Sequence, residues 1–547
     1  MALAQSHGSK ALAQAPAKAL GEALGGTVRS QEEGVMEGVV VSARKDGSTA
    51  TVSVISDKQG HFGFPSNRLS PGHYSLAIRA VGYDLDGLAS ADVGAGHAVT
   101  LNLALRKTTD LASQLTNAEW LMSMPGTDEQ KSSLMGCVNC HTLQRPVTST
   151  YTADQLTNVI HRMYGYSSGS EPGKAQRRVN ADVQAGSPEK YRKLAEYIAS
   201  INLSKGPEWG YSLKTLPRPS GRATHVIITS YDLPRERAMP HDVIVDEHGN
   251  AWYSDFGEEI VGELDPKTGK VREWPVPVLQ PDHPKGMLDI EEDQGGEIWL
   301  GMMFQAAIAR FDPKAEKFKT YSAPEVLNDN GAPKSQERQR EVTLQYRVDG
   351  KVWTTEDNGE IERVDLSTGK YERFQPLKNF AEPPPYSIYG IAADSQNNLY
   401  FAENVHSLIG RIDGKTGEVK FFRTPFPHSY PRRVQMDDQD RLWFGEYTGN
   451  RIGLFDTKTE KFTEWDAPTP WSGPYYVTRD KNGELWTGGM TSDRVTRLNP
   501  KTGEFVEYLM PKDTNMRRVF VDSSTTPVTF WAGSTHGAAI VKVEPLD

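Results

Sequence analysis

The chain has 547 residues, several times the usual length of a domain, so we expect two to four domains that each bury their own core. Hydrophobic residues make up 37% of the chain, and no apolar run approaches the roughly 18 residues of a membrane span, which excludes a spanning helix. The net charge of -10, with no concentrated basic face, excludes a nucleic-acid partner.

Residues 1–33 are rich in Ala, Gly and Gln, which predicts a flexible N-terminal segment. The segment lacks the basic start and apolar core of a secretory signal. Because the cofactor inferred below requires export, we expect that a leader has been removed and that the sequence begins near the mature terminus.

Residues 34–107 alternate apolar and polar side chains between turn signals, which predicts a small antiparallel β-sandwich. The G-V-V run at 38–40, "DKQGHFGF" at 57–64 and "GHYSLAIRAVGY" at 72–83 carry a resemblance to the carboxypeptidase regulatory-like, transthyretin-like domain family. The segment contains no acid–base or metal-ligating constellation. Two roles stay open for it, docking to a partner and structural capping.

The only two cysteines of the chain are Cys137 and Cys140, and His141 follows directly. A C-x-x-C-H run is what covalent attachment of a c-type haem demands: two thiols for the vinyl groups and an imidazole for the iron. A zinc ribbon would need a second cysteine pair, and a thioredoxin-type pair would need a βαβ pattern. The sequence therefore predicts one covalent haem c and, with it, a periplasmic location.

Three helices are expected around this motif. A capping box from Thr127 to Gln130 opens the first helix, and Thr152 with Gln155 opens the second. The third helix begins at Ser187 and Pro188. The second and third helices repeat apolar residues at helical spacing, namely Leu156, Val159, Ile160 and Met163, then Tyr191, Leu194, Ile198 and Ile201.

These helices together resemble a class I cytochrome c that covers residues 108–205. The resemblance implies a methionine as the sixth iron ligand, placed between the haem motif and the last helix. Met163 is the only methionine there, although its helical phase also fits a core residue. His161 is the first alternative, and Met122 or Met124 follow it.

From residue 222 onward an aromatic marker recurs every 43 to 54 positions, at Trp252, Trp299, Trp353, Tyr400, Trp443, Trp486 and Trp531. This is the period of a four-stranded propeller blade. The strand at 225–234 has the pattern of an outer blade strand but precedes the first full repeat, and the last repeat has no outer strand of its own. We therefore expect the two ends of the propeller to share one blade. Residues 206–547 therefore form a predicted seven-bladed β-propeller, and the whole chain is a mainly β, multidomain protein.

The repeat motifs resemble the streptogramin lyase (virginiamycin B lyase-like) propeller family over roughly the last 320 residues. In that family, elimination uses histidines at the inner-strand starts of the last two blades, a glutamate after the last marker and a magnesium ion. Tyr475, Arg517 and Ser534 occupy these places here. Because neither a phenol nor a guanidinium lends a lone pair near neutral pH, the resemblance predicts the fold more than the chemistry.

Alignment of the repeats on the marker predicts which side chains converge on the central channel. The candidate catalytic residues are His241, Tyr389, Arg432, Glu446, Tyr475 and Arg517. Cations and phenols at one mouth favour a small anionic, aromatic or otherwise unsaturated ligand. His241 with Asp255 leaves room for an additional metal ion in the channel.

The predicted function is a periplasmic c-type cytochrome oxidoreductase, in which the propeller binds a small-molecule substrate and electrons pass through the haem to a periplasmic acceptor. Two alternatives stay open: a lyase of the streptogramin lyase type with an accessory haem domain, and a non-catalytic electron-transfer or binding module.

Overall fold

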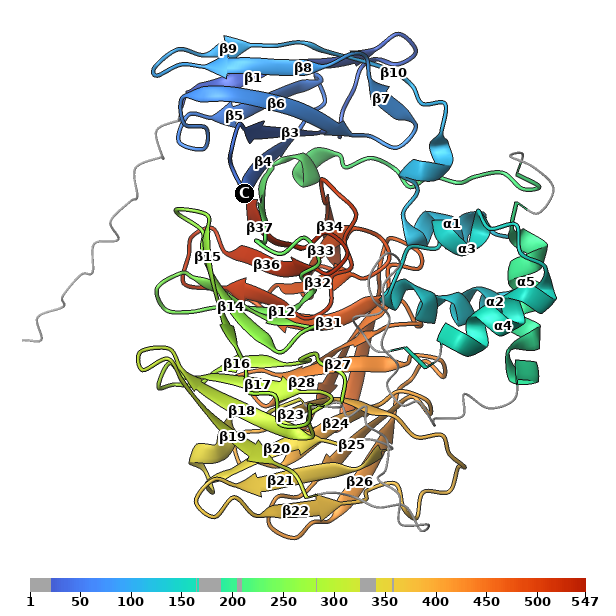
Figure 1. Cartoon of the computed structure of the whole chain (residues 1–547), viewed down its shortest axis with the longest axis vertical. Helices are drawn as coiled ribbons and strands as arrows, with labels where there is room; N and C mark the ends of the chain where they lie inside the picture. The colour runs from blue at the N-terminus through green and yellow to red at the C-terminus, as the bar shows by residue number, and fades with distance from the viewer. Residues whose placement is uncertain are drawn as a thin grey trace, which may run out of the picture.

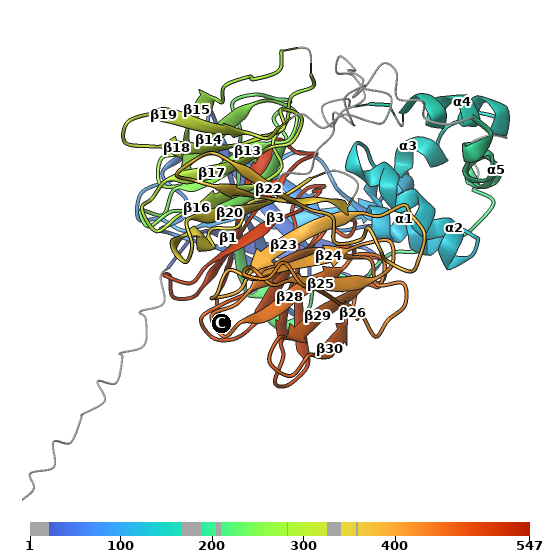
Figure 2. The same ribbon diagram turned by 90° about the horizontal axis from the view of Figure 1, so that it is seen from below.

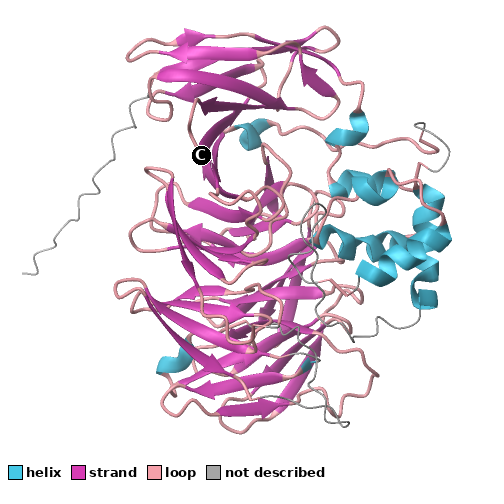
Figure 3. Cartoon of the chain, viewed as in Figure 1, coloured by secondary structure: helices cyan, strands magenta, loops and turns pink. Residues whose placement is uncertain are grey.

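The computed structural model describes residues 21–163, 165–166, 188–203, 209–281, 283–324, 341–356 and 359–547. Figure 1 shows a β-sandwich above a larger ring of β-sheets, with a group of helices against one side of the ring. Figure 3 shows that strands dominate and that nearly all helices gather in this group. No helix among the described residues has the length and apolar character that a bilayer span requires.

The N-terminal sandwich is built from two sheets. In the first, β1 pairs with β2, β5, β9 and β10, and β7 continues the sheet beyond β10. In the second, the order is β4-β3-β6-β8. The strands are β1 (Glu22–Ser30), β2 (Gly34–Val35), β3 (Val40–Lys45), β4 (Ala50–Ile55), β5 (His61–Pro65), β6 (Gly72–Arg79), β7 (Tyr83–Leu85), β8 (Ala89–Val93), β9 (Val99–Thr100) and β10 (Leu103–Lys107).

The predicted boundary of the sandwich at residue 34 is wrong, because β1 belongs to it. Leu24 and Val28 are fully buried in the sandwich core. The glycines that suggested a flexible segment allow close contact between strands: a Cβ on Gly26 would lie 2.0 Å from the carbonyl oxygen of Leu101. Residues 1–20 of the predicted flexible segment lie outside the described residues.

The helices form a small module over residues 111–201, here called the helical module. Both predicted capping boxes are present, since Thr127 exchanges hydrogen bonds with Gln130 at α2 and Thr152 does so with Gln155 at α4. Helices α4 and α5 pack together through buried apolar side chains such as Ile160 and Ile198. Its helices are η1 (Leu111–Gln114), α1 (Asn117–Ser123), α2 (Asp128–Ser132), η2 (Ser133–Asn139), α3 (Gln144–Val147), α4 (Ala153–Met163), η3 (Pro188–Tyr191) and α5 (Arg192–Ile201).

Seven sheets of the described residues form the blades of a propeller-like region (Figures 1 and 2). The first three blades are β12 (Pro240–Val245), β13 (Ala251–Asp255), β14 (Ile260–Asp265) and β15 (Lys270–Pro275); β16 (Ile290–Glu292), β17 (Ile298–Met302), β18 (Ala307–Asp312) and β19 (Lys317–Ser322); and β20 (Lys351–Thr355), β21 (Ile361–Asp365) and β22 (Tyr371–Phe374). In the third blade, a single bridge from Val342 to Thr354 stands in place of an inner strand. The short helix η4 (Gly221–Thr224) precedes β11 (Val226–Asp232), and η5 (Gln345–Arg347) lies between β19 and β20.

The last four blades complete the ring. They are β23 (Ile388–Ala393), β24 (Leu399–Glu403), β25 (Leu408–Ile412) and β26 (Val419–Arg423); β27 (Pro431–Met436), β28 (Arg441–Glu446), β29 (Arg451–Asp456) and β30 (Lys461–Asp466); β31 (Pro474–Arg479), β32 (Leu485–Gly489), β33 (Arg494–Asn499) and β34 (Glu504–Leu509); and β35 (Val519–Asp522), β36 (Thr529–Ser534), β37 (Ala539–Pro545) and β11 (Val226–Asp232). Antiparallel pairing of β11 with β37 confirms that the two ends of the propeller share one blade.

The aromatic marker of each repeat lies in the second strand of its blade. Four of the indoles donate a hydrogen bond to a carboxylate six residues earlier: Trp252 to Asp246 at 2.9 Å, Trp299 to Asp293 at 3.0 Å, Trp443 to Asp437 at 2.9 Å and Trp486 to Asp480 at 2.9 Å. Burial of the ring and this bond hold the turn between the first two strands. The marker therefore stabilises the blade.

The sandwich is fused to the propeller through a continuous sheet. Strand β4 pairs with β11, from Ile228 opposite Ser53 to Tyr231 opposite Ala50, so the outer edge of the shared blade is covered. Arg79 of β6 adds an ion pair to Asp493 at 2.7 Å, and both side chains are largely buried. The sandwich therefore extends the sheet of the last blade.

Replacement of Arg79 by alanine should lower the free energy of unfolding by about 3 kcal/mol, because it leaves the buried Asp493 carboxylate without its cation. Urea titration of the whole chain measures this loss. Arg106→Ala is the matched control, since Arg106 is 54% exposed and lies 3.8 Å from Asp84, and it should cost less than about 1 kcal/mol. Equal effects of the two variants would contradict a structural role for the Arg79 pair.

Candidate functional site

Four inner strands of the propeller carry a β-bulge at the same end of the channel. The register shifts between Pro240 and Val243 in β12, and at the equivalent places in β23, β27 and β31. A bulge re-aims side chains at the start of a strand, so each bulge presents two successive residues toward the channel. The first residues of these pairs form one layer and the second residues form another.

The first layer, here called the mouth cluster, brings together side chains from five blades. Its members are His241, Phe256, Tyr389, Arg432, Tyr447, Tyr475 and Arg517. The hydroxyls of Tyr389 and Tyr475 are hydrogen-bonded to each other, and the ring of His241 lies 6.1 Å from that of Tyr475. Five of the six candidate residues predicted from the repeats therefore lie together.

Glu446 is the predicted residue that lies apart from the cluster. The charged groups that act on it, Glu464, Arg451 and Asp466, come from the two outer strands of its own blade. Burial and the neighbouring Glu464 raise the pKa of Glu446. The repeat alignment placed Glu446 correctly at the end of β28, but the side chain packs between strands of its blade.

His241 is bound to a carboxylate that the sequence analysis did not single out. Its Nδ1 donates a hydrogen bond to Asp242 Oδ1 at 2.5 Å, and Arg433 holds the other oxygen of Asp242 at 2.8 Å. Nε2 of His241 is buried and has no hydrogen-bond partner among the described residues. Burial, with smaller contributions from Arg517 and Arg433, lowers the pKa of His241 well below its usual value. The imidazole is therefore neutral and presents a free lone pair at the mouth.

Asp255, the partner expected for His241, instead forms an ion pair with Arg235 at 2.5 Å. The side chain of Asp242 was overlooked because neighbours in a regular strand point to opposite faces. The bulge in β12 removes that alternation.

Arg432 is a cation without an anionic partner among the residues that the structure describes. Its guanidinium stacks on three phenol rings, 4.5 Å from the centres of Tyr447 and Tyr475 and 5.0 Å from that of Tyr389. The Nε atom is buried and makes no hydrogen bond within the described chain. A buried cation held by aromatic faces attracts an anion of matching size.

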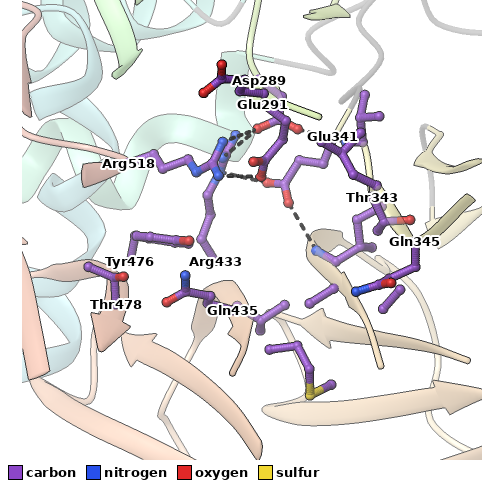
Figure 4. A pocket seen from close by; sticks show the side chains of 18 of the residues that line it. Asp289, Glu291, Glu341, Thr343, Gln345, Arg433, Gln435, Tyr476, Thr478 and Arg518 are labelled. Carbon is purple, nitrogen blue, oxygen red and sulfur yellow. Dashed lines mark hydrogen bonds and ion pairs between the residues drawn. The ribbon is translucent and has the colours of Figure 1, made fainter. Parts of the chain in front are cut away.

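The second layer is a network of ion pairs across the channel (Figure 4). Arg433 contacts Asp242, Asp289 at 3.2 Å and Glu341 at 2.7 Å. Arg518 contacts Asp289 at 3.0 Å and also pairs with Glu291. Burial raises the pKa of the Glu341 carboxyl. Residues of this network line a cavity of about 420 Å³, which Val434 and Thr478 of the inner strands also line.

The predicted haem-attachment motif is docked on the mouth cluster. Asn515 Nδ2 donates to the carbonyl of Val138 at 3.0 Å, and Arg517 donates to the carbonyl of Asn139 at 3.0 Å. Tyr447 OH donates to the carbonyl of Met135 at 3.2 Å. The backbone of η2 and the C-x-x-C-H run thus covers the channel mouth.

The residues of the motif fit covalent haem attachment. Cys137 and Cys140 are free thiols on one turn, and burial raises the pKa of Cys137 to about 12. His141 uses Nδ1 for a hydrogen bond to the carbonyl of Thr142 at 2.9 Å, so Nε2 is left for an iron. Cys137, Cys140 and His141 would hold the group.

The sixth ligand stays a prediction. Met163 is the last residue of α4 and is half-buried. His161, the first alternative, packs its ring 6.0 Å from that of Tyr191. Met122 is half-buried and Met124 is buried in the core. Within the described ranges, no group of three or more His, Cys, Asp or Glu side chains could hold a metal ion, so the additional channel metal finds no ligand set there.

Comparison with known proteins supports two of the three predicted parts. The model of the virginiamycin B lyase family matches residues 280–545, and that of the carboxypeptidase regulatory-like domain matches residues 23–106. A streptogramin B lyase structure is 23% identical with a TM-score of 0.50, over 59% of this chain and 99% of that chain. Virginiamycin B lyase from Staphylococcus aureus is 24% identical with a TM-score of 0.48, over 58% of this chain and 99% of that chain.

No curated protein matches this chain. The likeness to the streptogramin B lyase structure concerns the fold. The family matches support a carboxypeptidase regulatory-like domain in the N-terminal part of the chain and a virginiamycin B lyase-like propeller in its C-terminal part.

Proposed function

We propose that this protein is a periplasmic c-type cytochrome oxidoreductase whose propeller mouth binds a small anionic substrate with an aromatic or unsaturated body. One observation carries the proposal: Asn515 and Arg517 hold the backbone of the C-x-x-C-H motif directly on the mouth cluster. When bound through Cys137, Cys140 and His141, a haem would supply a one-electron acceptor beside the substrate and pass each electron to a periplasmic partner.

The mouth cluster supports the binding of an anion. Arg432 has no carboxylate partner within the described chain and would pair with a substrate carboxylate. The faces of Tyr389, Tyr447 and Tyr475 surround the guanidinium and would pack against a flat substrate body. The docked motif limits the access of water and so strengthens the ion pair.

The His241–Asp242 pair supports the removal of a proton as the substrate is oxidised. Nε2 of His241 would accept the proton, and Asp242 would stabilise the imidazolium that results. Two protons and two electrons leave a substrate C–H and its neighbouring O–H or N–H. His241 relays the protons to water, and the electrons leave one at a time toward the external acceptor.

A lyase reaction is the second candidate, because the virginiamycin B lyase family model matches residues 280–545. The family's base positions hold Tyr475 and Arg517 here, and burial raises the pKa of Tyr475 well above its usual value, so its phenol stays protonated. The His241–Asp242 pair offers a different base on the same ring. In this reading the substrate is cleaved and no electrons leave it.

Incubation of the oxidised holoprotein with a panel of aromatic and unsaturated carboxylates, without oxygen, separates these functions. Haem reduction in step with substrate loss supports the oxidoreductase. Substrate loss with the haem still oxidised supports the lyase. Binding without either change would leave only an electron-transfer or binding module.

Expression of the chain with haem-attachment machinery should add the mass of one haem, and Cys137→Ala with Cys140→Ala should abolish this gain. Intact-protein mass spectrometry measures the result. Ser133→Ala, an exposed position in η2, is the control and should keep the haem. A wild-type protein with its unmodified mass would contradict the proposal.

Arg432→Gln should raise KM for the carboxylate substrate about 10- to 100-fold, because a charge-assisted hydrogen bond in a buried site is lost. Steady-state haem reduction measures KM. Arg451→Gln is the control, since Arg451 also stacks on a ring, that of Phe426, but already pairs with Asp466 at 2.7 Å. An equal rise in both variants would indicate a general loss of structure.

His241→Asn should lower kcat about 100- to 10,000-fold with little change in substrate affinity. In the wild type the base must be neutral, and folding lowers the pKa of His241 below 6.5, so the rate should hold through the neutral range. It should fall only as the pH drops further, through the lowered pKa. A pH–rate profile measures this fall in rate. A midpoint of the fall at or above pH 6.5 would argue against His241 as the base.

A further inference from the structure

The last blade presents a histidine beside the haem-attachment motif. His536 lies in the short turn between β36 and β37. The turn is held firmly, because Thr535 Oγ1 donates to the carbonyl of Pro240 at 3.1 Å and the amide of Gly537 donates to Ser534 at 3.2 Å. The position of the imidazole is therefore set by the propeller.

Both ring nitrogens of His536 are buried, and neither meets the geometry of a hydrogen bond to another described residue, although the backbone of Val138 is near enough to act on the ring. A buried imidazole usually satisfies at least one nitrogen, since the loss of water otherwise costs free energy. His406, another largely buried histidine of the propeller, satisfies both, with Glu403 at 3.2 Å and the carbonyl of Pro383 at 3.1 Å. The orphaned nitrogens of His536 indicate a partner that is not part of the polypeptide.

The surroundings of His536 identify where that partner lies. Burial, with a smaller contribution from Arg517, lowers the pKa of His536 to about 4, and the backbone of Val138 partly opposes this shift, so the ring lies against the C-x-x-C-H run. The turn that carries His536 also contacts the segment before Asn515, since Ser534 Oγ donates to the carbonyl of Asp513 at 3.4 Å. The neighbouring carbonyl of Val138 already accepts a hydrogen bond from Asn515. Val138 lies between the two cysteines of the motif, so His536 adjoins the site where a haem would be attached.

We propose that His536 is the sixth ligand of the haem iron, supplied by the propeller to a group that the helical module attaches. This inference rests on the proposed function, because it requires the haem. An imidazole with a free lone pair, on a turn that adjoins the C-x-x-C-H run, has the chemistry of an iron ligand. Met163, which the sequence favoured, would then be a core residue at the end of α4.

A ligand from the propeller has a consequence for the redox centre. Two imidazoles favour ferric iron more than an imidazole with a thioether does, so the midpoint potential is lower than with Met163. The ligand also ties the iron to the same blade that carries Asn515 and Arg517. Iron coordination and substrate binding at the mouth then depend on the same part of the propeller.

Near-infrared magnetic circular dichroism and electron paramagnetic resonance of the ferric, full-length holoprotein test the ligand set. The wild type should show low-spin iron with two imidazole ligands and no thioether charge-transfer band. His536→Ala should convert the iron to a high-spin or otherwise altered form, and added imidazole should restore the low-spin signal. Because the wild-type spectrum is informative by itself, the test does not depend on the folding of the variant.

Two control variants sharpen the result. His406→Ala removes another largely buried propeller histidine and should leave the spectrum unchanged, as should Met163→Leu. A thioether band in the wild type that disappears in Met163→Leu would overturn the inference while the haem and the proposed function stand. A wild type without haem would overturn the proposed function and the ligand together.

Discussion

The pairing of β11 with β37 is the constraint on which the arrangement of this protein depends. Seven residue pairs, from Val226 opposite Pro545 to Asp232 opposite Ala539, join the start of the propeller to its end. The segment before β11 must therefore end at the last blade. The helical module precedes β11 in the chain, and its C-x-x-C-H motif meets the loops of that same blade. Closure of the ring thus brings the motif to the channel mouth.

The same pairing explains how the sandwich is held. Strand β11 has a free edge once it has paired with β37, and β4 occupies that edge. Buried contacts such as the ion pair of Arg79 with Asp493 add to the backbone pairing. A covered edge prevents association with other chains and fixes the sandwich to the blade. The position of the N-terminal domain follows from ring closure as well.

The channel combines a rigid layer with a reactive one. Arg433 and Arg518 share four carboxylates, and paired charges that are largely buried in this way restrict one another's geometry. The layer above contains a neutral His241 and an unpaired Arg432. Because both guanidinium groups of this network are paired with carboxylates, the network adds no unpaired cation, and the charge of Arg432 is left to act at the mouth.

The sequence by itself determined the repeat, the blade count, the shared last blade, the capping boxes and five of the seven residues that meet at the mouth. These features depend on local periodicity and on spacing from a buried aromatic marker, which the order of residues records directly. Only the tertiary structure decided the role of β1, the Asp242 partner of His241 and the place of Glu446. It alone also set the ring of His536 against the C-x-x-C-H run. Each of these depends on a bulge or on contacts between residues far apart in the chain, and no local pattern encodes such contacts.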